Sequence, residues 1–259
     1  MRSSLLASED FRPVSLAELE ASAGLLDRVD RKYVVPVEIF ATVAERLADT
    51  HAILDIDGVR AFEYRTAYYD TPGLDTYRDH VQGRRRRYKC RSRHYVDSGG
   101  CSFELKLKGL RGRTIKQRIA YDTALHGSVT PEALDFVRSG LQHAYGRAPG
   151  CLMPVLHMTY LRTTLVDVAG CERLTCDERL RFHGCGSAGG ALQDGVVILE
   201  SKSRDGAGLA DRLLQDLGMR AIDSCSKYCL GVGMTRPDVR ANIFRPMLRR
   251  WFAPDGAAA

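Results

Sequence analysis

The sequence lacks the features that mark several large classes of protein. None of its eight cysteines forms a Cys-x-x-Cys pair or stands at zinc-finger spacing from a histidine, which argues against a zinc cluster. The first ten residues have no basic start followed by an apolar stretch, so we expect no secretory signal and reduced cysteines. The longest apolar runs, such as Val196–Leu199, are too short to cross a bilayer. These absences predict a cytoplasmic protein without a membrane span, which would need a membrane-protein partner for attachment.

Common nucleotide-binding signatures are also missing. The chain has no Gly-x-Gly-x-x-Gly string, no P-loop and no alternating strand–helix rhythm. Its 259 residues, 44% of them hydrophobic, allow one large domain or two small ones. Lys and Arg number 38 against 32 acidic residues, a net charge of +6 that suits an anionic partner but is shared by many ordinary proteins.

Hydrophobic periodicity predicts about eight strands and at least four helices. The expected strands span residues 28–35, 62–69, 84–96, 102–108, 114–121, 155–168, 173–182 and 195–202. The expected helices span residues 37–48, 74–81, 131–145 and 209–217. Short glycine-containing links, one of them at residues 109–112, join the strands between 84 and 121, which predicts an antiparallel meander.

Charged residues recur every second position in these strands, so they share a face. The residues on the charged faces are Arg28, Asp30, Lys32, Arg87, Lys89, Arg91, Arg93, Glu104, Lys106, Lys108, Lys116, Arg118, Arg162, Glu200 and Lys202. Each strand taken alone favours a charged face turned to water and an apolar face turned to the core. Alternation by itself does not distinguish the outside of a barrel from its inside.

The signs of these charges favour a second interpretation. Exposed faces usually mix signs, yet these strands carry eleven or more cations against three carboxylates. Like charges on neighbouring strands repel by roughly 1.5–2 kcal/mol at about 10 Å and an effective dielectric near 20. A bound polyanion or metal–phosphate would relieve that repulsion. The basic run 84–87 also suggests nucleic acid, but no aromatic residues interleave on the charged face as stacking platforms, so we expect no nucleic-acid partner.

Nine short strings, in order, resemble the VTC domain, the polyphosphate polymerase domain of the triphosphate tunnel metalloenzyme (CYTH-like) superfamily. The strings are Arg28-Val-Asp-Arg-Lys-Tyr33, Tyr68-Tyr-Asp-Thr-Pro72, Tyr77-x-x-His80-x-x-Gly83, Arg87-Tyr-Lys-Cys-Arg-Ser-Arg93, Phe103-Glu-Leu-Lys106, Gly112-Arg-Thr-Ile-Lys-Gln-Arg118, Tyr160-Leu-Arg162, Leu199-Glu-Ser-Lys202 and Cys225-Ser-Lys-Tyr228. The sequence departs from the family pattern where Arg28 and Asp30 replace two glutamates and where Ser224 replaces a lysine.

The resemblance implies an α+β fold in which a closed antiparallel β-barrel forms a basic tunnel, with helices packed outside. It divides the chain into an adaptor at residues 1–27, a tunnel domain at 28–233 and a basic tail at 234–259. It also implies ATP as phosphoryl donor, triphosphate and polyphosphate as ligands, and a divalent metal, Mn²⁺ or Mg²⁺.

The resemblance further implies residue roles. Catalytic phosphate contacts would come from Lys32, Arg91, Arg93, Lys106, Arg162 and Lys227. Further ligand contacts would come from Lys89, Lys108, Lys116, Arg118 and Lys202, and metal coordination from Glu200 and Glu104. The expected activity is ATP-dependent polyphosphate synthesis. A metal-dependent triphosphate hydrolase and a non-catalytic polyanion-binding module are the alternatives.

Overall fold

The computed structural model describes residues 10–21, 29–109, 114–169, 172–186, 188–222 and 225–255. The strands are β1 (Arg12–Val14), β2 (Val29–Pro36), β3 (His51–Leu54), β4 (Phe62–Asp70), β5 (Tyr88–Tyr95), β6 (Gly100–Lys108), β7 (Thr114–Ala120), β8 (Met153–Asp167), β9 (Glu172–Gly184), β10 (Gly190–Leu192), β11 (Val196–Ser203) and β12 (Phe252–Pro254). The helices are α1 (Leu16–Ala21), α2 (Val37–Leu47), α3 (Asp75–Val81), α4 (Pro131–Tyr145), α5 (Leu209–Asp216), α6 (Lys227–Thr235) and α7 (Arg245–Trp251), with a 3-10 turn η2 (Thr123–Leu125). None of these helices has the length and apolar character needed to cross a membrane.

The expectation of a closed barrel of about eight strands is wrong. The strands form one sheet of 12, in the order β12-β10-β9-β8-β4-β5-β6-β7, with β11 on β9, β2 on β11, β3 on β8 and β1 on β3. Among the described residues, no pairing closes this sheet into a barrel. Side-chain alternation shows which residues share a face but carries no information about which strands pair, so it did not test closure.

The chain divides into two compact units. Unit 1 comprises residues 1–63, 160–180 and 192–225, and unit 2 comprises residues 64–159, 181–191 and 226–259. The long strands β8 and β9 contribute residues to both units. The two units are described separately below.

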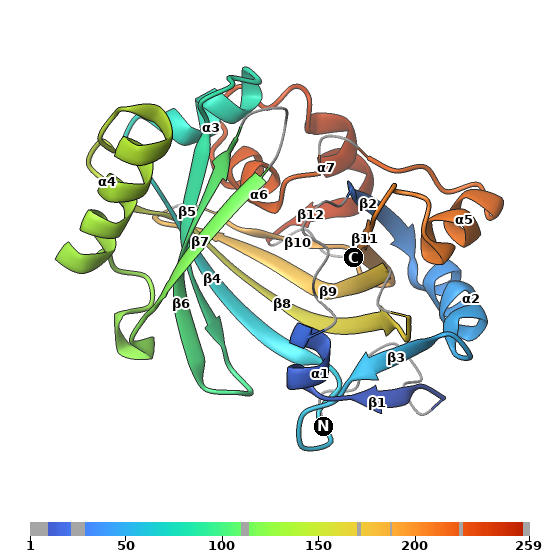
Figure 1. The fold of residues 1–259 in the computed structure, drawn as a ribbon. Helices are drawn as coiled ribbons and strands as arrows, with labels where there is room; N and C mark the ends of the chain where they lie inside the picture. The colour runs from blue at the N-terminus through green and yellow to red at the C-terminus, as the bar shows by residue number, and fades with distance from the viewer. Residues whose placement is uncertain are drawn as a thin grey trace. The chain divides into compact units, whose positions relative to one another are not determined.

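The core of unit 1 lies between its strands and the helices α2 and α5, which Figure 1 shows beside β2 and β11. Tyr33, Leu174 and Leu199 from the strands pack against Phe40 and Leu213 from the helices. Because each of these strand residues alternates with a polar neighbour, the opposite face of the same strands is polar.

A buried polar network holds α5 on this sheet. The Tyr33 hydroxyl donates to one Asp211 carboxylate oxygen at 2.7 Å, and the Ser201 hydroxyl donates to the other at 2.9 Å. Burial and the nearby Asp211 carboxylate raise the pKa of Tyr33 to about 12. Since both strand residues are neighbours of charged positions, Lys32 and Glu200 respectively, the network also fixes the backbone beside those charges.

In unit 2 the strands β5 to β7 form the meander that the sequence predicted, β4 pairs with β5 at its side, and α4 covers one face of it (Figure 1). The predicted bounds of α4 are confirmed. Its start is capped by the Thr130 hydroxyl, which accepts from the Ala133 amide at 3.2 Å, and Gly146 ends it at φ +67°. Gly140 sits in the middle of α4, where a Cβ would lie 2.5 Å from a Leu105 methyl, so the helix approaches β6 closely.

The strand predicted from residue 84 begins four residues later. Residues 84–87 form an irregular connection after α3, and Gly83 precedes them at φ +65°. The predicted tail also contains regular structure, since α7 and β12 lie in residues 245–254. The predictions for Arg28, Ser224 and the turn residues 110–112 fall outside the described residues.

Candidate functional site

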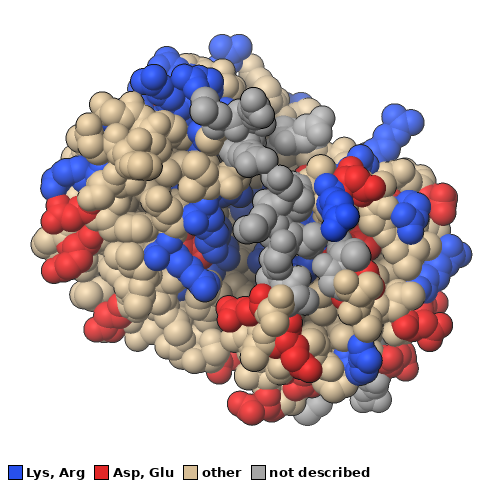
Figure 2. All heavy atoms as spheres, in the orientation of Figure 1, with Lys and Arg blue, Asp and Glu red and all other residues tan. Residues whose placement is uncertain are grey.

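The charged face of unit 2 is built by the register of β4 to β7. Lys89, Lys106 and Lys116 are paired in one row across β5, β6 and β7. The next row contains Tyr68, Arg91, Glu104 and Arg118. With Arg93 and Lys108, the face that we call the unit 2 cationic face carries seven cations and one carboxylate. Figure 2 shows Lys and Arg atoms beside a few acidic ones where Figure 1 draws these strands.

Glu104 is the carboxylate at the centre of this face and is only 1% exposed. Its Oε2 lies 2.6 Å from Arg91 Nη2, and its Oε1 lies 2.7 Å from Lys116 Nζ. Burial alone would raise the pKa of Glu104, but Arg91, Arg93 and Lys116 outweigh it and hold that pKa well below its usual range. Glu104 is therefore an ionised group that binds and orients the cations around it.

The surrounding cations also repel one another. The pKa of Lys116 is lowered to about 8, first by loss of solvent around the ammonium and then by Arg91 and Arg93, although Glu104 opposes the change. Such a depressed value is expected where several cations converge, because each disfavours the charge of its neighbours. The face therefore favours the approach of an anion.

Tyrosines hold the two arginines of β5. Arg91 lies over the Tyr68 ring at 5.8 Å and donates from Nη1 to the Tyr68 hydroxyl at 3.1 Å. Arg93 lies over the Tyr64 ring at 5.3 Å. The sequence shows no aromatic residues interleaved on this face as stacking platforms; β4 places Tyr64 and Tyr68 beside its arginines. Tyr68 is 5% exposed, so its ring supports a guanidinium and is not open for stacking on a base.

The start of α6 also meets the unit 2 cationic face. Lys89 Nζ donates to the Ser226 hydroxyl at 2.7 Å, and that hydroxyl also caps α6 by accepting from the Cys229 amide at 3.3 Å. The Tyr228 hydroxyl donates to the buried Asp70 carboxylate at 2.5 Å. The two resemblance strings that contain Asp70 and Tyr228 are thus joined in space, and Lys227 stands between Ser226 and Tyr228 at the helix start.

His80, on α3, faces the same set of cations. Its Nδ1 is buried and has no hydrogen-bond partner among the described residues. Burial lowers the pKa of His80 to about 2, with further contributions from Lys89, Arg87, Lys106 and Lys108. The imidazole is therefore a neutral group in a cationic environment.

A smaller charged cluster lies on the polar face of unit 1. Glu200 on β11 is paired with Lys32 on β2, and their charged atoms lie 3.7 Å apart. Lys202 Nζ lies 3.1 Å from the other Glu200 oxygen. Burial lowers the pKa of Lys202, with Arg162 adding to the effect and Glu200 opposing it. The Glu200 side chain keeps 14% of its surface exposed, so it is more accessible than Glu104.

Arg162 on β8 is held by a carboxylate that the sequence reasoning missed. It donates from Nε and Nη2 to the two oxygens of Asp177 on β9 at 2.6 and 2.7 Å. Asp177 is fully buried, and the Tyr160 ring lies 5.2 Å from the Arg162 guanidinium. Strand alternation places Asp177 on the face opposite to the core residue Cys176. This alternation is the sequence signal that could have identified Asp177 as a residue of the polar face.

The structure groups the predicted site residues into two sets. In unit 2 these are Lys89, Arg91, Arg93, Glu104, Lys106, Lys108, Lys116, Arg118 and Lys227. In unit 1 they are Lys32, Arg162, Glu200 and Lys202, and Lys202 is the cross-strand partner of Asp30. The supporting residues Tyr64, Tyr68, Asp177 and Ser226 were not predicted as site residues.

Comparison with solved structures shows what fold this chain shares. It is similar to HpAC1 from Hippeastrum, named as an adenylyl cyclase with a dominant triphosphatase activity, at 16% identity and a TM-score of 0.51, covering 80% of this chain and 95% of that one. It is also similar to a protein from Vibrio parahaemolyticus named as an adenylate cyclase, at 16% identity and a TM-score of 0.43, covering 79% and 97% of the two chains. A search of curated proteins found no match.

The family assignment comes from the sequence over most of its length. The family model of the VTC domain matches residues 27–235, which include every predicted site residue in both units. This match confirms the resemblance that the nine strings indicated. The chain therefore belongs to the VTC domain family.

Proposed function

We propose that this chain is a phosphoryl-transfer enzyme of the polyphosphate polymerase type, which uses ATP to extend a phosphate chain. The observation that supports this most strongly is the unit 2 cationic face, where seven cations surround one buried and fully engaged carboxylate. Family membership makes a phosphate-chain ligand the natural occupant of such a face. Arginine forks suit phosphate oxygens in pairs, and lysines add mobile point charges.

The residue roles follow from the contacts. Arg91 is held in place by Tyr68 and Glu104, and Arg93 lies over the Tyr64 ring, so both are prepared to bind phosphate oxygens without large rearrangement. Lys106, Lys116 and Arg118 extend the same face along β6 and β7. In unit 1, Arg162 is fixed by Asp177 in a comparable way. Preorganised donors of this kind stabilise the charge that develops in phosphoryl transfer.

The two candidate metal ligands differ in how well they fit a divalent ion. No group of three or more metal-binding side chains is present among the described residues, so a cage made by protein alone does not fit. Mg²⁺ is commonly held by one or two carboxylates together with substrate phosphates, and the partly exposed Glu200 fits that requirement. Glu104 keeps only 2% of its side chain exposed, against 14% for Glu200, and its oxygens lie 2.6 and 2.7 Å from Arg91 and Lys116, so we assign Glu104 to orientation instead.

In the proposed reaction the terminal phosphate oxygen of an acceptor chain attacks the γ-phosphorus of ATP. One oxygen–phosphorus bond forms, the bond to the β–γ bridging oxygen breaks, and ADP leaves. The cations of the site hold donor and acceptor in line and neutralise the non-bridging oxygens. A divalent ion held at Glu200 would supply additional charge stabilisation for the leaving group. No nucleophilic side chain is needed.

A triphosphate hydrolase is the second candidate function. The Hippeastrum protein that shares this fold has a dominant triphosphatase activity. In that case water would replace the acceptor chain, and the same cations would stabilise the same developing charge. The two activities therefore differ in the acceptor and not in the binding of the donor.

One assay separates these candidates. Purified protein is incubated with ATP and Mn²⁺ or Mg²⁺, and the products are resolved on a gel and by free-phosphate measurement. We expect long phosphate chains from the wild type and a large loss of product from Glu200→Gln. Arg138→Ala serves as the control, because Arg138 is an exposed arginine whose ion pair among the described residues is with Asp135 on the same helix, α4. Free phosphate without chains would favour the hydrolase, and binding without any product would contradict both enzymes.

A further inference from the structure

A second cationic region of unit 2 surrounds a pocket of about 450 Å³ where β6, β7 and the end of α4 meet the connection before β5. Arg85, Arg86, Lys108 and His143 line it with polar groups. Leu107, Ile115 and Ala144 line it with apolar groups. Figure 2 shows Lys and Arg atoms at the upper edge of the unit, where Figure 1 draws the chain between α3 and β5.

The apolar wall of this pocket lies on the opposite side of the sheet from the unit 2 cationic face. Leu107 belongs to the core that packs against α4, and Ile115 is its cross-strand partner on β7. Their neighbours Lys106 and Lys116 lie on the other side because successive strand residues alternate between faces. The apolar wall is therefore distinct from the surface that we assign to phosphoryl transfer, and Lys108, at the end of β6, is the residue that the pocket and that surface share.

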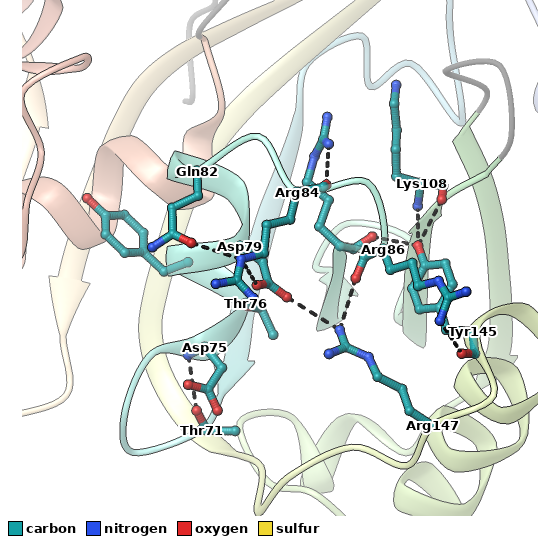
Figure 3. Close-up of polar contacts among 12 residues, drawn as sticks. Thr71, Asp75, Thr76, Asp79, Gln82, Arg84, Arg86, Lys108, Tyr145 and Arg147 are labelled. Carbon is teal, nitrogen blue, oxygen red and sulfur yellow. Dashed lines mark hydrogen bonds and ion pairs between the residues drawn. The ribbon is translucent and has the colours of Figure 1, made fainter.

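Backbone contacts shape this region, as Figure 3 shows. The Tyr145 hydroxyl accepts from the Lys108 amide at 2.8 Å and lies 2.7 Å from the Arg87 carbonyl. Arg86 in turn donates to the Tyr145 carbonyl at 3.3 Å. Arg147 donates to the Arg86 carbonyl at 3.0 Å and lies over the Tyr88 ring at 5.6 Å. The connection that carries the arginines is thus tied to β6 and α4.

The arginines of this connection have more positive charge than the nearby acids neutralise. Arg84 and Arg147 share a single carboxylate, Asp79, each at 3.4 Å. Arg86 and Arg87 donate to neutral carbonyl groups. Arg85 makes no hydrogen bond or ion pair within the described ranges of the chain. An anion at this pocket would therefore meet guanidinium groups whose charge is not already paired.

We propose that this pocket is a binding site for a nucleoside diphosphate. Arg85 and Arg86 would contact the phosphates, and the base would cover Ile115, which is 45% exposed in the structure. A bare phosphate chain gains nothing from the apolar wall, whereas a flat heterocycle removes it from water. The volume also falls within the range of small-ligand pockets. The site goes beyond the proposed function, because it would bind nucleotide outside the phosphoryl-transfer face.

The test uses radiolabelled ADP and equilibrium dialysis of the full chain, with excess tripolyphosphate added to occupy the unit 2 cationic face. We expect ADP to remain bound under these conditions. Arg85→Glu should weaken ADP binding about tenfold or more, since one hydrogen-bonded charge contact contributes about that much. Because Arg85 has no hydrogen bond or ion pair with any described residue, we expect this change to leave the structure intact.

Two further variants complete the test. Ile115→Asp should also weaken ADP binding, because it removes the apolar wall from an exposed position, and Arg138→Ala should leave it unchanged. Melting curves of each variant check that the fold is retained. Complete displacement of ADP by tripolyphosphate would overturn the proposal. Equal ADP affinity in the wild type, Arg85→Glu and Ile115→Asp would overturn it as well.

Discussion

The charged clusters of the two units differ in their balance of sign. The unit 2 cationic face gathers seven cations around Glu104, whereas the unit 1 cluster sets Lys32, Arg162 and Lys202 against Glu200 and Asp177. A strong excess of one sign is costly without a counter-ion, because like charges on neighbouring strands repel. The nearly balanced charges of the unit 1 cluster carry no such cost, and the Glu200 carboxylate there stays partly exposed. The comparison suggests that the unit 2 face has the higher affinity for anions and that the unit 1 cluster holds the more accessible carboxylate.

The buried carboxylates of the two units should respond differently when an arginine is removed. Arg162→Ala leaves Asp177 buried without its bidentate partner, so we expect the free energy of unfolding to fall by about 3–5 kcal/mol. Arg91→Ala should lower it less, because Glu104 keeps Lys116 at 2.7 Å. Urea denaturation measures both variants, with Arg138→Ala as the control. Equal losses for Arg91→Ala and Arg162→Ala would remove this distinction between the units.

Replacing each glutamate tests the assignment of the metal to unit 1. We expect Glu200→Gln to lower the turnover of ATP by about 100-fold or more, as expected when a group that stabilises the transition-state charge is lost. Glu104→Gln should have a smaller effect on turnover, because it disturbs the orientation of Arg91 but removes no metal ligand. Steady-state rates at several Mn²⁺ concentrations separate the two. If added Mn²⁺ restored Glu104→Gln and not Glu200→Gln, the assignments would have to be exchanged.

The assignment of anion affinity to unit 2 predicts unequal losses of triphosphate binding. At a hundredfold excess over its dissociation constant, tripolyphosphate should stabilise the fold by about 2.7 kcal/mol, and equimolar sulfate should stabilise it less. Lys106→Ala should weaken triphosphate binding by about tenfold. Lys32→Ala should weaken it less, because Lys32 is already paired with Glu200 without a ligand. Calorimetric titration gives both affinities, and a larger loss for Lys32→Ala would reverse the assignment.

The sequence predicted local structure and the composition of the faces well. Helix α4 was predicted with its correct bounds because Thr130, Pro131 and Gly146 supply the start and stop signals. Strand alternation placed Arg91 and Glu104 each on the charged face of its own strand, and the register shows that the two are cross-strand partners. Both inferences depend only on neighbouring residues, which is why a single sequence was sufficient for them.

The features that the sequence did not predict depend on contacts between distant segments. The prediction of a closed barrel was wrong. The alternation of side chains within one strand does not indicate which other strand it pairs with. Asp177 was missed because its role comes from Arg162 on another strand. Tyr68 was quoted in a resemblance string, but only its pairing with Arg91 shows that it supports a guanidinium. Residues 84–87 were assigned to a strand because their basic run continues the charge pattern of β5.

The smallest expected effect concerns pH and distinguishes the units by His126 in unit 2 and Glu172 in unit 1. Burial lowers the pKa of His126 in unit 2 to about 4, with further contributions from His157, His94 and Arg65. The unfolded chain takes up this proton near pH 6.5, so between about pH 6.5 and 4 it binds more protons than the fold. Stability from this group is therefore complete above pH 6.5 and is lost as the pH falls.

Unit 1 should respond only at lower pH, because its buried His51 lies 3.6 Å from Glu172, and the pKa of that carboxyl is lowered. Burial opposes this lowering, but contacts with His51 and the Ala210 amide outweigh it. Hydrogen exchange at pH 7 and pH 5 should therefore show a loss of protection around His126 before any loss around Glu172. In His126→Gln this difference between pH values should shrink, because the glutamine amide does not titrate. An unchanged pH response in that variant would show that another group in unit 2 carries the acid sensitivity.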